Sequence, residues 1–303
     1  MYADWLWIPL VLAAAAAQTV RNAAQRGLVK SAGTLPATLV RFVFGLPFAA
    51  CALAALAATA STPLPAAGPA FLAWVSLGAI AQLLATAFLV AAMDQRSFVV
   101  AVAYSKTELL QLGVFSIVLL AEPPTLAAVF SIVLATAGVV LLSVKPAGER
   151  GTGVASWFSP AAALGLASGA GFALSAVGYR AAALALDHPQ PWVAGVFALV
   201  YAQALQSALL GGWLALRDRA GLAVVWREWR VSLLAGFTGA LASAGWLTAF
   251  AMRNAVDVRI VGLVEVLYSY LLSRQLFREQ VREREIAGVA LVVAGILIVS
   301  GYR

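Results

Sequence analysis

The sequence predicts an all-α integral membrane protein with ten transmembrane helices, arranged as two inverted five-helix repeats. Three observations support this fold class. The chain of 303 residues is 63% hydrophobic and 11% charged, whereas a soluble domain carries about 25% charged residues. Apolar segments of roughly the ~20 residues that span a bilayer as a helix occur ten times. The chain also repeats itself at a constant spacing.

The repeat joins positions that lie 157 residues apart (253 minus 96). Four polar or glycine residues of the first half recur in the second at this step: Arg96 as Arg253, Glu108 as Glu265, Glu122 as Glu279, and Gly138 as Gly295. The hydrophobic pairs Leu110/Leu267 and Leu119/Leu276 keep the same spacing. An apolar chain that is duplicated in this way is typical of transporters built from two related halves.

Each apolar segment is expected to be a helix, because unsatisfied backbone groups are too costly in lipid. The expected helices are 5–27, 36–59, 69–93, 98–120, 125–144, 160–184, 191–216, 231–252, 257–277 and 286–301. Eight of the nine tryptophans lie at segment ends, as in an interfacial belt, and Trp246 is the exception. The tight break Glu122-Pro123-Pro124 separates the fourth and fifth segments.

The duplication divides the chain into residues 1–147, an inter-half loop at 148–159, and residues 160–303. Five spans per half is an odd number, so the second half enters the membrane in the opposite sense to the first. The two halves are therefore expected to be related by a pseudo-twofold axis in the membrane plane.

These features together resemble the drug/metabolite transporter superfamily, EamA type. The resemblance rests on Leu120-Ala121-Glu122 followed by Ala137-Gly138-Val139, and on Phe277-Arg278-Glu279 followed by Ala294-Gly295-Ile296. It implies a secondary carrier for amino acids, related metabolites or drug-like compounds, most often an exporter. One departure is that the fourth segment holds Lys106 and Glu108, where the family usually has uncharged residues.

Composition argues against several other functions. The single cysteine, Cys51, excludes an internal disulfide and is expected to be a buried small hydrophobe. The only histidine, His188, lies in a predicted loop, so no histidine cluster suggests a metal or acyl-transfer site. No Walker or Rossmann motif is present. We expect no cofactor, no metal, no nucleic-acid partner and no enzymatic activity.

Two carboxylates lie inside predicted membrane segments, at Glu108 and at its repeat partner Glu265. A charge there costs at least ~2.5 kcal/mol on insertion scales, so it is by default part of a substrate or ion pathway. Glu108 is expected ten residues into its helix, near the membrane midplane. The alternative is that a neighbouring cation neutralises each glutamate for packing alone: Lys106 or Arg41 for Glu108, and Arg259 for Glu265.

Further candidates for substrate binding or coupling surround these two. Tyr104 shares a helix face with Glu108, whereas Lys106 does not unless the helix is broken there. Tyr268 shares a face with Glu265, and Arg41 is a candidate for either a structural counter-ion or a substrate contact. For Tyr104 and Tyr268 ordinary packing stays open.

The first segment carries a polar stripe at helical spacing, formed by Gln18, Arg21, Asn22 and Gln25. The stripe is expected to face a water-filled cavity or another helix, with Gln18 and Asn22 assigned to the cavity. Trp246 is a large residue in a segment rich in small ones, and it either fills a gap or forms the wall of a ligand site.

We therefore expect a secondary active transporter of the cell membrane that moves a small polar or amphiphilic metabolite by alternating access. A channel-like facilitator is the alternative, and a membrane enzyme that uses the buried carboxylates is a weaker one. The partners are the substrate, membrane lipid, and either a coupling proton or an exchanged metabolite. The chain is expected to function as a monomer.

Loop charges give a membrane orientation that conflicts with the resemblance. Twelve basic residues are expected in odd-numbered connections, against Arg180, Arg253, Arg259 and Arg303 on the other side. The positive-inside rule then places both termini outside. The resemblance implies both termini inside, so the sequence leaves the orientation open.

Overall fold

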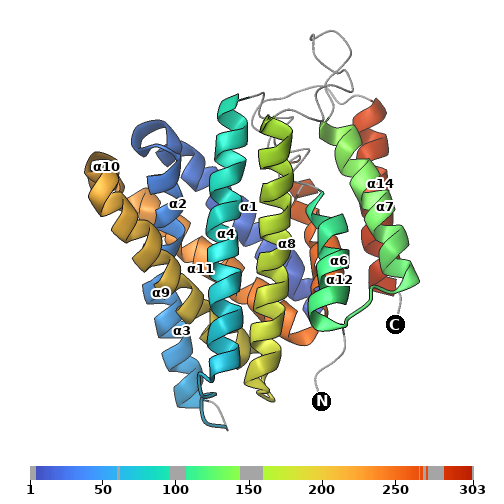
Figure 1. Ribbon diagram of the computed structural model, residues 1–303, viewed down its shortest axis with the longest axis horizontal. Helices are drawn as coiled ribbons and strands as arrows, with labels where there is room; N and C mark the ends of the chain where they lie inside the picture. The colour runs from blue at the N-terminus through green and yellow to red at the C-terminus, as the bar shows by residue number, and fades with distance from the viewer. Residues whose placement is uncertain are drawn as a thin grey trace. The chain divides into compact units, whose positions relative to one another are not determined.

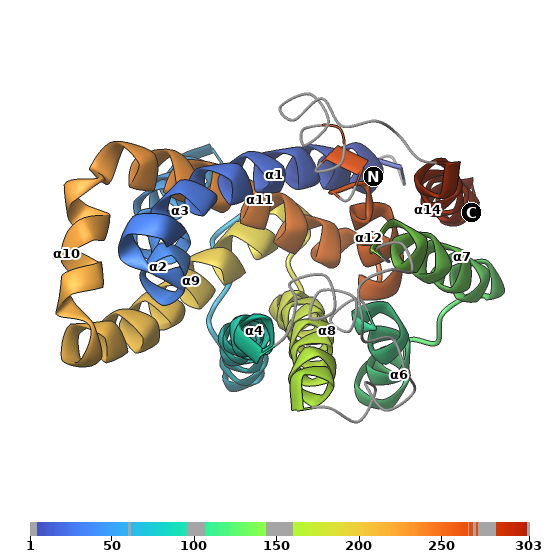
Figure 2. The ribbon, with the colours of Figure 1, turned by 90° about the horizontal axis from the view of Figure 1, so that it is seen from above.

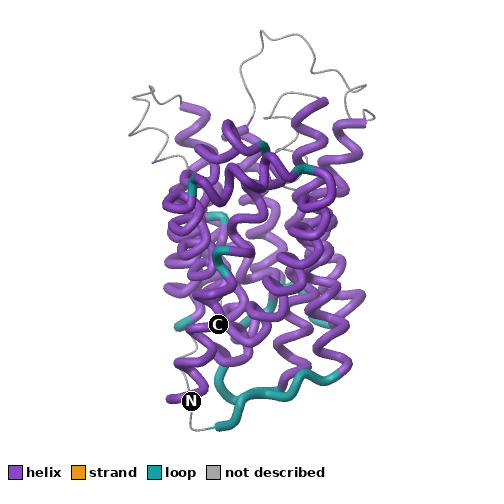
Figure 3. The backbone as a smooth tube through the Cα atoms, turned by 90° about the vertical axis from the view of Figure 1, so that its left-hand side faces the viewer, coloured by secondary structure: helices purple, strands orange, loops and turns teal. Residues whose placement is uncertain are grey.

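The computed structural model describes residues 5–59, 62–95, 107–143, 160–265, 267–268, 271 and 283–301. Across these residues the regular secondary structure is helical throughout, and short loops join the helices (Figure 3). The all-α prediction is confirmed. The predicted inter-half loop, Tyr104 and Lys106 lie outside the described residues.

The helices are labelled in Figure 1. Their bounds are α1 (Trp7–Ala32), α2 (Thr34–Val43), α3 (Leu46–Thr59), α4 (Pro69–Gln95), α6 (Glu108–Leu120), α7 (Leu126–Ser143), α8 (Pro160–Leu186), α9 (Pro191–Arg217), α10 (Arg219–Arg227), α11 (Trp229–Met252), α12 (Ala255–Gly262) and α14 (Glu283–Gly301).

Five stretches of the described chain are long and apolar enough to cross a membrane. They are Thr34–Thr59, Pro69–Leu89, Ala162–Leu186, Pro191–Arg217 and Trp229–Met252. Three shorter apolar helices accompany them, at Glu108–Leu120, Leu126–Leu141 and Ile286–Gly301. Helix α1 has 26 residues but is not among the five, and it is the helix that carries the polar stripe.

The chain forms two compact units, each made of two separate stretches of sequence. Unit 1 contains residues 1–80 and 178–254, and unit 2 contains residues 81–177 and 255–303. The divisions fall inside α4 and α8. Each unit therefore combines parts of both predicted sequence halves.

Unit 1 is organised around α11, which packs against α1 and α9. Small residues permit the close approach: an added side-chain carbon on Gly245 would lie 2.8 Å from Cβ of Ala14. Helix α10 joins α9 to α11 (Figure 2), in a stretch that the sequence predicts to be a loop. Its N-terminus is capped by the Asp218 side chain, which accepts a hydrogen bond from the Gly221 amide at 2.9 Å.

Unit 2 is organised around α7 and α14, which lie side by side in Figures 1 and 2. An added carbon on Gly138 would meet the Gly288 carbonyl oxygen at 2.6 Å and Cγ2 of Val292 at 2.8 Å. An added carbon on Gly295 would meet the Ser131 carbonyl oxygen at 3.0 Å and Cβ of Ala135 at 3.3 Å. These contacts are reciprocal, because Gly138/Gly295, Ser131/Gly288 and Ala135/Val292 all keep the same repeat spacing.

The described parts of the two segments that carry Glu108 and Glu265 each contain a helix break, which corrects the predicted ranges. Helix α6 begins at Glu108, with Thr107 in a turn, so Glu108 lies in a first turn rather than ten residues into a helix. Helix α12 ends at Gly262, and the Leu263 amide bonds the Ile260 carbonyl at 3.1 Å, a tightened final turn. Broken helices of this kind occur at the binding sites of transporters.

Two further breaks are explained by local bonding. The predicted second helix is interrupted at Phe44–Gly45, and the Arg41 carbonyl accepts a hydrogen bond from Nε2 of Gln203 at 3.4 Å. Helix α6 ends as predicted before the Glu122-Pro123-Pro124 break. Ala121 takes a left-handed conformation there (φ 54°), and its amide bonds the Ile117 carbonyl at 3.2 Å, as in an αL C-cap motif.

Candidate functional site

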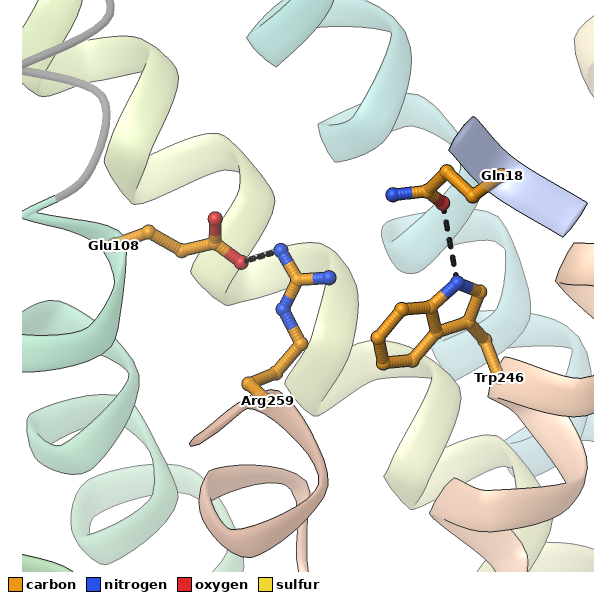
Figure 4. A network of polar contacts seen from close by, with 4 residues as sticks. All are labelled: Gln18, Glu108, Trp246 and Arg259. Atoms are coloured by element: carbon orange, nitrogen blue, oxygen red, sulfur yellow. Dashed lines mark hydrogen bonds and ion pairs between the residues drawn. The ribbon is translucent and has the colours of Figure 1, made fainter. Parts of the chain in front are cut away.

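Glu108 and Arg259 form an ion pair in the described part of unit 2. Nη2 of Arg259 donates to Oε1 of Glu108 (Figure 4). The Glu108 side chain is 10% exposed and that of Arg259 is 25% exposed.

The ion pair lies in the wall of a cleft within unit 2. The lining residues come from α6, from α7 and from the broken segment at the end of α12: Glu108, Leu109, Thr136, Val139, Arg259, Gly262, Leu263 and Glu265. The cleft is narrow: the centre of a water molecule can reach about 30 Å³ of it, within about 440 Å³ of empty space that includes the open mouth. The structure therefore brings the two repeat-related glutamates, Glu108 and Glu265, to one cleft.

This arrangement places carboxylate and guanidinium groups side by side in a largely apolar unit. Two carboxylates can accept hydrogen bonds from an ammonium group, and Arg259 can donate to a carboxylate. The cleft thus offers complementary partners to a molecule that carries charges of both signs.

The partner of Glu108 differs from the sequence-based suggestions. Lys106 and Arg41 were the proposed neighbours, and Arg259 was assigned to Glu265. Arg259 donates to Glu108, and α12 packs against α6, whose first residue is Glu108; Lys106 lies outside the described residues. Arg259 also lies inside α12 and Arg180 inside α8, so neither belongs to a loop as the charge count assumed.

In unit 1, the polar stripe of α1 contacts neighbouring helices. Oε1 of Gln18 accepts from Nε1 of Trp246 at 3.1 Å (Figure 4), and Nε2 of Gln25 donates to the Ala37 carbonyl at 2.7 Å. Arg21 is buried and donates to Oδ1 of Asn22 from Nε and Nη2, at 3.2 and 2.8 Å, whereas Asn22 itself is exposed. Two residues assigned to a cavity, Gln18 and Asn22, therefore have different environments.

Arg41 lies in α2, and its guanidinium carbon is 4.6 Å from the ring centroid of Phe42. An added carbon on Gly239 would lie 3.1 Å from Cδ of Arg21 and 3.3 Å from Cβ of Arg41. The glycine of α11 thus makes room for two arginine side chains.

Several other candidates have clear outcomes. Tyr268 is partly buried but is not among the residues that line the cleft. Cys51 is exposed on α3, which corrects the expected burial, because α3 presents this face outward. Among the described residues, no group of three or more His, Cys, Asp or Glu side chains is placed to hold a metal ion.

Two residues of unit 2 were missed by sequence reasoning. Asp257 is 1% exposed in the first turn of α12, and the sequence analysis had treated it only as a segment start. Thr136 lines the cleft; it is one of several hydroxyl residues in an apolar helix, and the sequence does not distinguish it from the others.

Comparisons with known proteins inform the fold alone. No protein-family model matches the chain, and no curated protein is similar to it. A solved structure described as "Crystal structure of protein" is similar with a TM-score of 0.72 and 20% sequence identity, over 98% of this chain and 96% of that chain. At this identity the likeness establishes a shared helical fold alone.

Proposed function

We propose that this protein is a secondary carrier of the EamA type, which moves a small polar or amphiphilic metabolite across the membrane by alternating access. The observation that carries the proposal is the buried Glu108–Arg259 ion pair in a cleft shared with Glu265. Ionisable groups in membrane segments mark substrate or ion pathways by default, because their burial is costly.

The architecture of unit 2 supports the same function. The reciprocal contacts of Gly138 and Gly295 follow the repeat spacing of the sequence, as expected for two inverted five-helix repeats. The helix breaks next to Glu108 and Glu265 are features of carriers whose substrate sites lie at such breaks. The ten-span count and an exporting direction in the cell membrane belong to this proposal, since the EamA resemblance implies them.

Transport into proteoliposomes tests the proposal directly. The purified chain is reconstituted and supplied with labelled amino acids, a polyamine and a dicarboxylate, with and without a pH gradient. We expect saturable uptake of at least one zwitterionic compound. Absence of saturable uptake across the panel in both conditions would refute a carrier of this substrate class.

A second measurement separates a carrier from a channel. Cysteines are introduced at Glu108 and Glu265 in a Cys51→Ala background, because Cys51 is exposed and would itself react. Alternating access predicts that each cysteine is reachable by a small thiol reagent from either side, but never from both sides in one locked state. Simultaneous labelling from both faces would identify a channel instead.

A further inference from the structure

Thr136 carries a hydroxyl that helix packing leaves unexplained. Five other threonines in the described helices donate to the carbonyl four residues earlier, at 2.7–2.9 Å: Thr19, Thr38, Thr59, Thr86 and Thr238. The Oγ1 atom of Thr136 is buried and has no hydrogen-bond partner among the described residues. Thr136 also lines the cleft that contains the Glu108–Arg259 ion pair.

A buried hydroxyl without a partner is destabilising, and an apolar residue of the same shape would avoid that cost. The chain itself contains this alternative. The repeat partner of Thr136, 157 positions later, is Val293 in α14. Valine and threonine have nearly the same shape, so the repeated helix needs only a β-branched residue at this position. Helix packing therefore does not require the hydroxyl, and of the two repeat-related positions the one that lines the cleft carries it.

We propose that Thr136 is a substrate-binding residue, whose hydroxyl forms a hydrogen bond with a small zwitterion held in the unit 2 cleft. This inference rests on the proposed carrier function and names the chemistry of its site. The carboxylates of Glu108 and Glu265 receive the ammonium group of the ligand, and Arg259 receives its carboxylate. A hydroxyl can both donate and accept, so Thr136 adds a neutral hydrogen-bonding contact beside the charged groups.

Ser131 provides a matched control on the same helix. Its Oγ is also buried without a partner among the described residues, and the residue is fully buried. It does not line the cleft, however; its carbonyl oxygen faces Gly295 in the contact between α7 and α14. A general effect of removing a partnerless hydroxyl from α7 should therefore appear in both Ser131→Ala and Thr136→Val.

The test measures ligand binding by the full chain in detergent, using calorimetry and thermal stability. The probes are L-alanine, L-glutamine and L-leucine as zwitterions, putrescine as a plain dication, and succinate as a plain dianion. We expect at least one zwitterion to bind, and neither putrescine nor succinate. Thr136→Val should raise the Kd for that zwitterion about threefold to tenfold, the loss of one neutral hydrogen bond. Thr136→Ser should restore most of the affinity, and Ser131→Ala should leave the Kd within about twofold.

Four results would overturn the inference: no zwitterion binds, Thr136→Val binds as well as the original chain, Ser131→Ala weakens binding equally, or Thr136→Val fails to fold. Uptake by the same variants in proteoliposomes separates this inference from the carrier function. If a zwitterion binds in a Thr136-dependent way but is not transported, the carrier function is refuted and the proposed binding site stands. Transport that is unaffected by Thr136→Val would remove only the role of Thr136.

Discussion

The two compact units deal with buried polarity in different ways. In unit 1, buried polar side chains bond to backbone carbonyls and amide groups. Gln206, which is 1% exposed, donates to the Ala79 carbonyl at 3.2 Å, and Arg180 donates to the Phe250 carbonyl at 2.7 Å. In unit 2, a described contact is the Glu108–Arg259 ion pair. Buried hydroxyls without a partner among the described residues occur in both units but are more numerous in unit 2: Ser116, Ser131, Thr136, Ser168 and Ser300, against Ser207 in unit 1.

The two units also differ in the number and position of their charged residues. Residues of unit 1 include ten basic and four acidic side chains, and those of unit 2 include ten basic and nine acidic ones. The described acidic residues of unit 1 lie at helix ends, where water can solvate their charges. They are Asp187, Asp218 and Glu228. Unit 2 keeps Glu108 and Asp257 buried. Bonds to the backbone fix one packing, whereas charged pairs and free hydroxyls can exchange partners, which suits a substrate site.

The largest effect should follow from neutralising the ion pair. Glu108→Gln removes the carboxylate charge that pairs with Arg259 and should reduce transport at least tenfold, which corresponds to about 1.4 kcal/mol or more of transition-state free energy. The double variant Glu108→Gln/Arg259→Gln removes both charges and should regain the thermal stability that either single variant loses.

Transport separates function from packing in this series. If the pair only holds helices together, the double variant will recover transport along with stability. A double variant that is stable and inactive places the pair in the mechanism. The measurements are uptake rates and detergent melting temperatures for the two single variants and the double variant.

The next largest effect concerns the contact between α7 and α14 in unit 2. Gly138→Ala should destabilise the chain by about 1–3 kcal/mol, because the new methyl group would meet backbone atoms of the partner helix. Gly113→Ala is the control, since only Cδ1 of Ile132 lies near, at 3.9 Å. Equal melting temperatures for the two variants would contradict the close α7–α14 contact.

A smaller effect is expected in unit 1. Trp246→Phe removes the Nε1 donor to Gln18 and should cost about 1 kcal/mol of stability, with transport kinetics little changed. The measurement pairs melting temperature with the KM for uptake. A raised KM at unchanged stability would show that Gln18 and Trp246 take part in substrate recognition. The contrast between a structural role for polar groups in unit 1 and a substrate site in unit 2 would then be wrong.

The smallest effect is expected at the end of α6. Ala121 has φ 54°, a left-handed conformation that disfavours residues with a side chain. Ala121→Gly should therefore raise stability by about 1 kcal/mol without altering transport. Leu120→Gly, one residue earlier and inside the helix, should lower stability instead. A drop in melting temperature for Ala121→Gly would show that unfolded-chain entropy dominates at this turn.

The sequence by itself determined the helical class and the length and apolar character of several segments that could cross a membrane. Hydrophobic runs and proline breaks report these features directly, because each depends on residues that are neighbours in the chain. The constant repeat spacing also pairs Gly138 with Gly295, the two residues that make reciprocal contacts in the structure.

The tertiary structure decided which residues meet. The pairing of Arg259 with Glu108 follows from the packing of α12 against α6, whose first residue is Glu108; α12 ends at Gly262. Neither of these helix ends is visible in hydropathy, since both lie within apolar runs. Thr136 joins the cleft only because α7 packs beside α6 and α12. Local composition sets where helices can form, whereas the partner of a buried polar group depends on which distant segments the fold brings next to it.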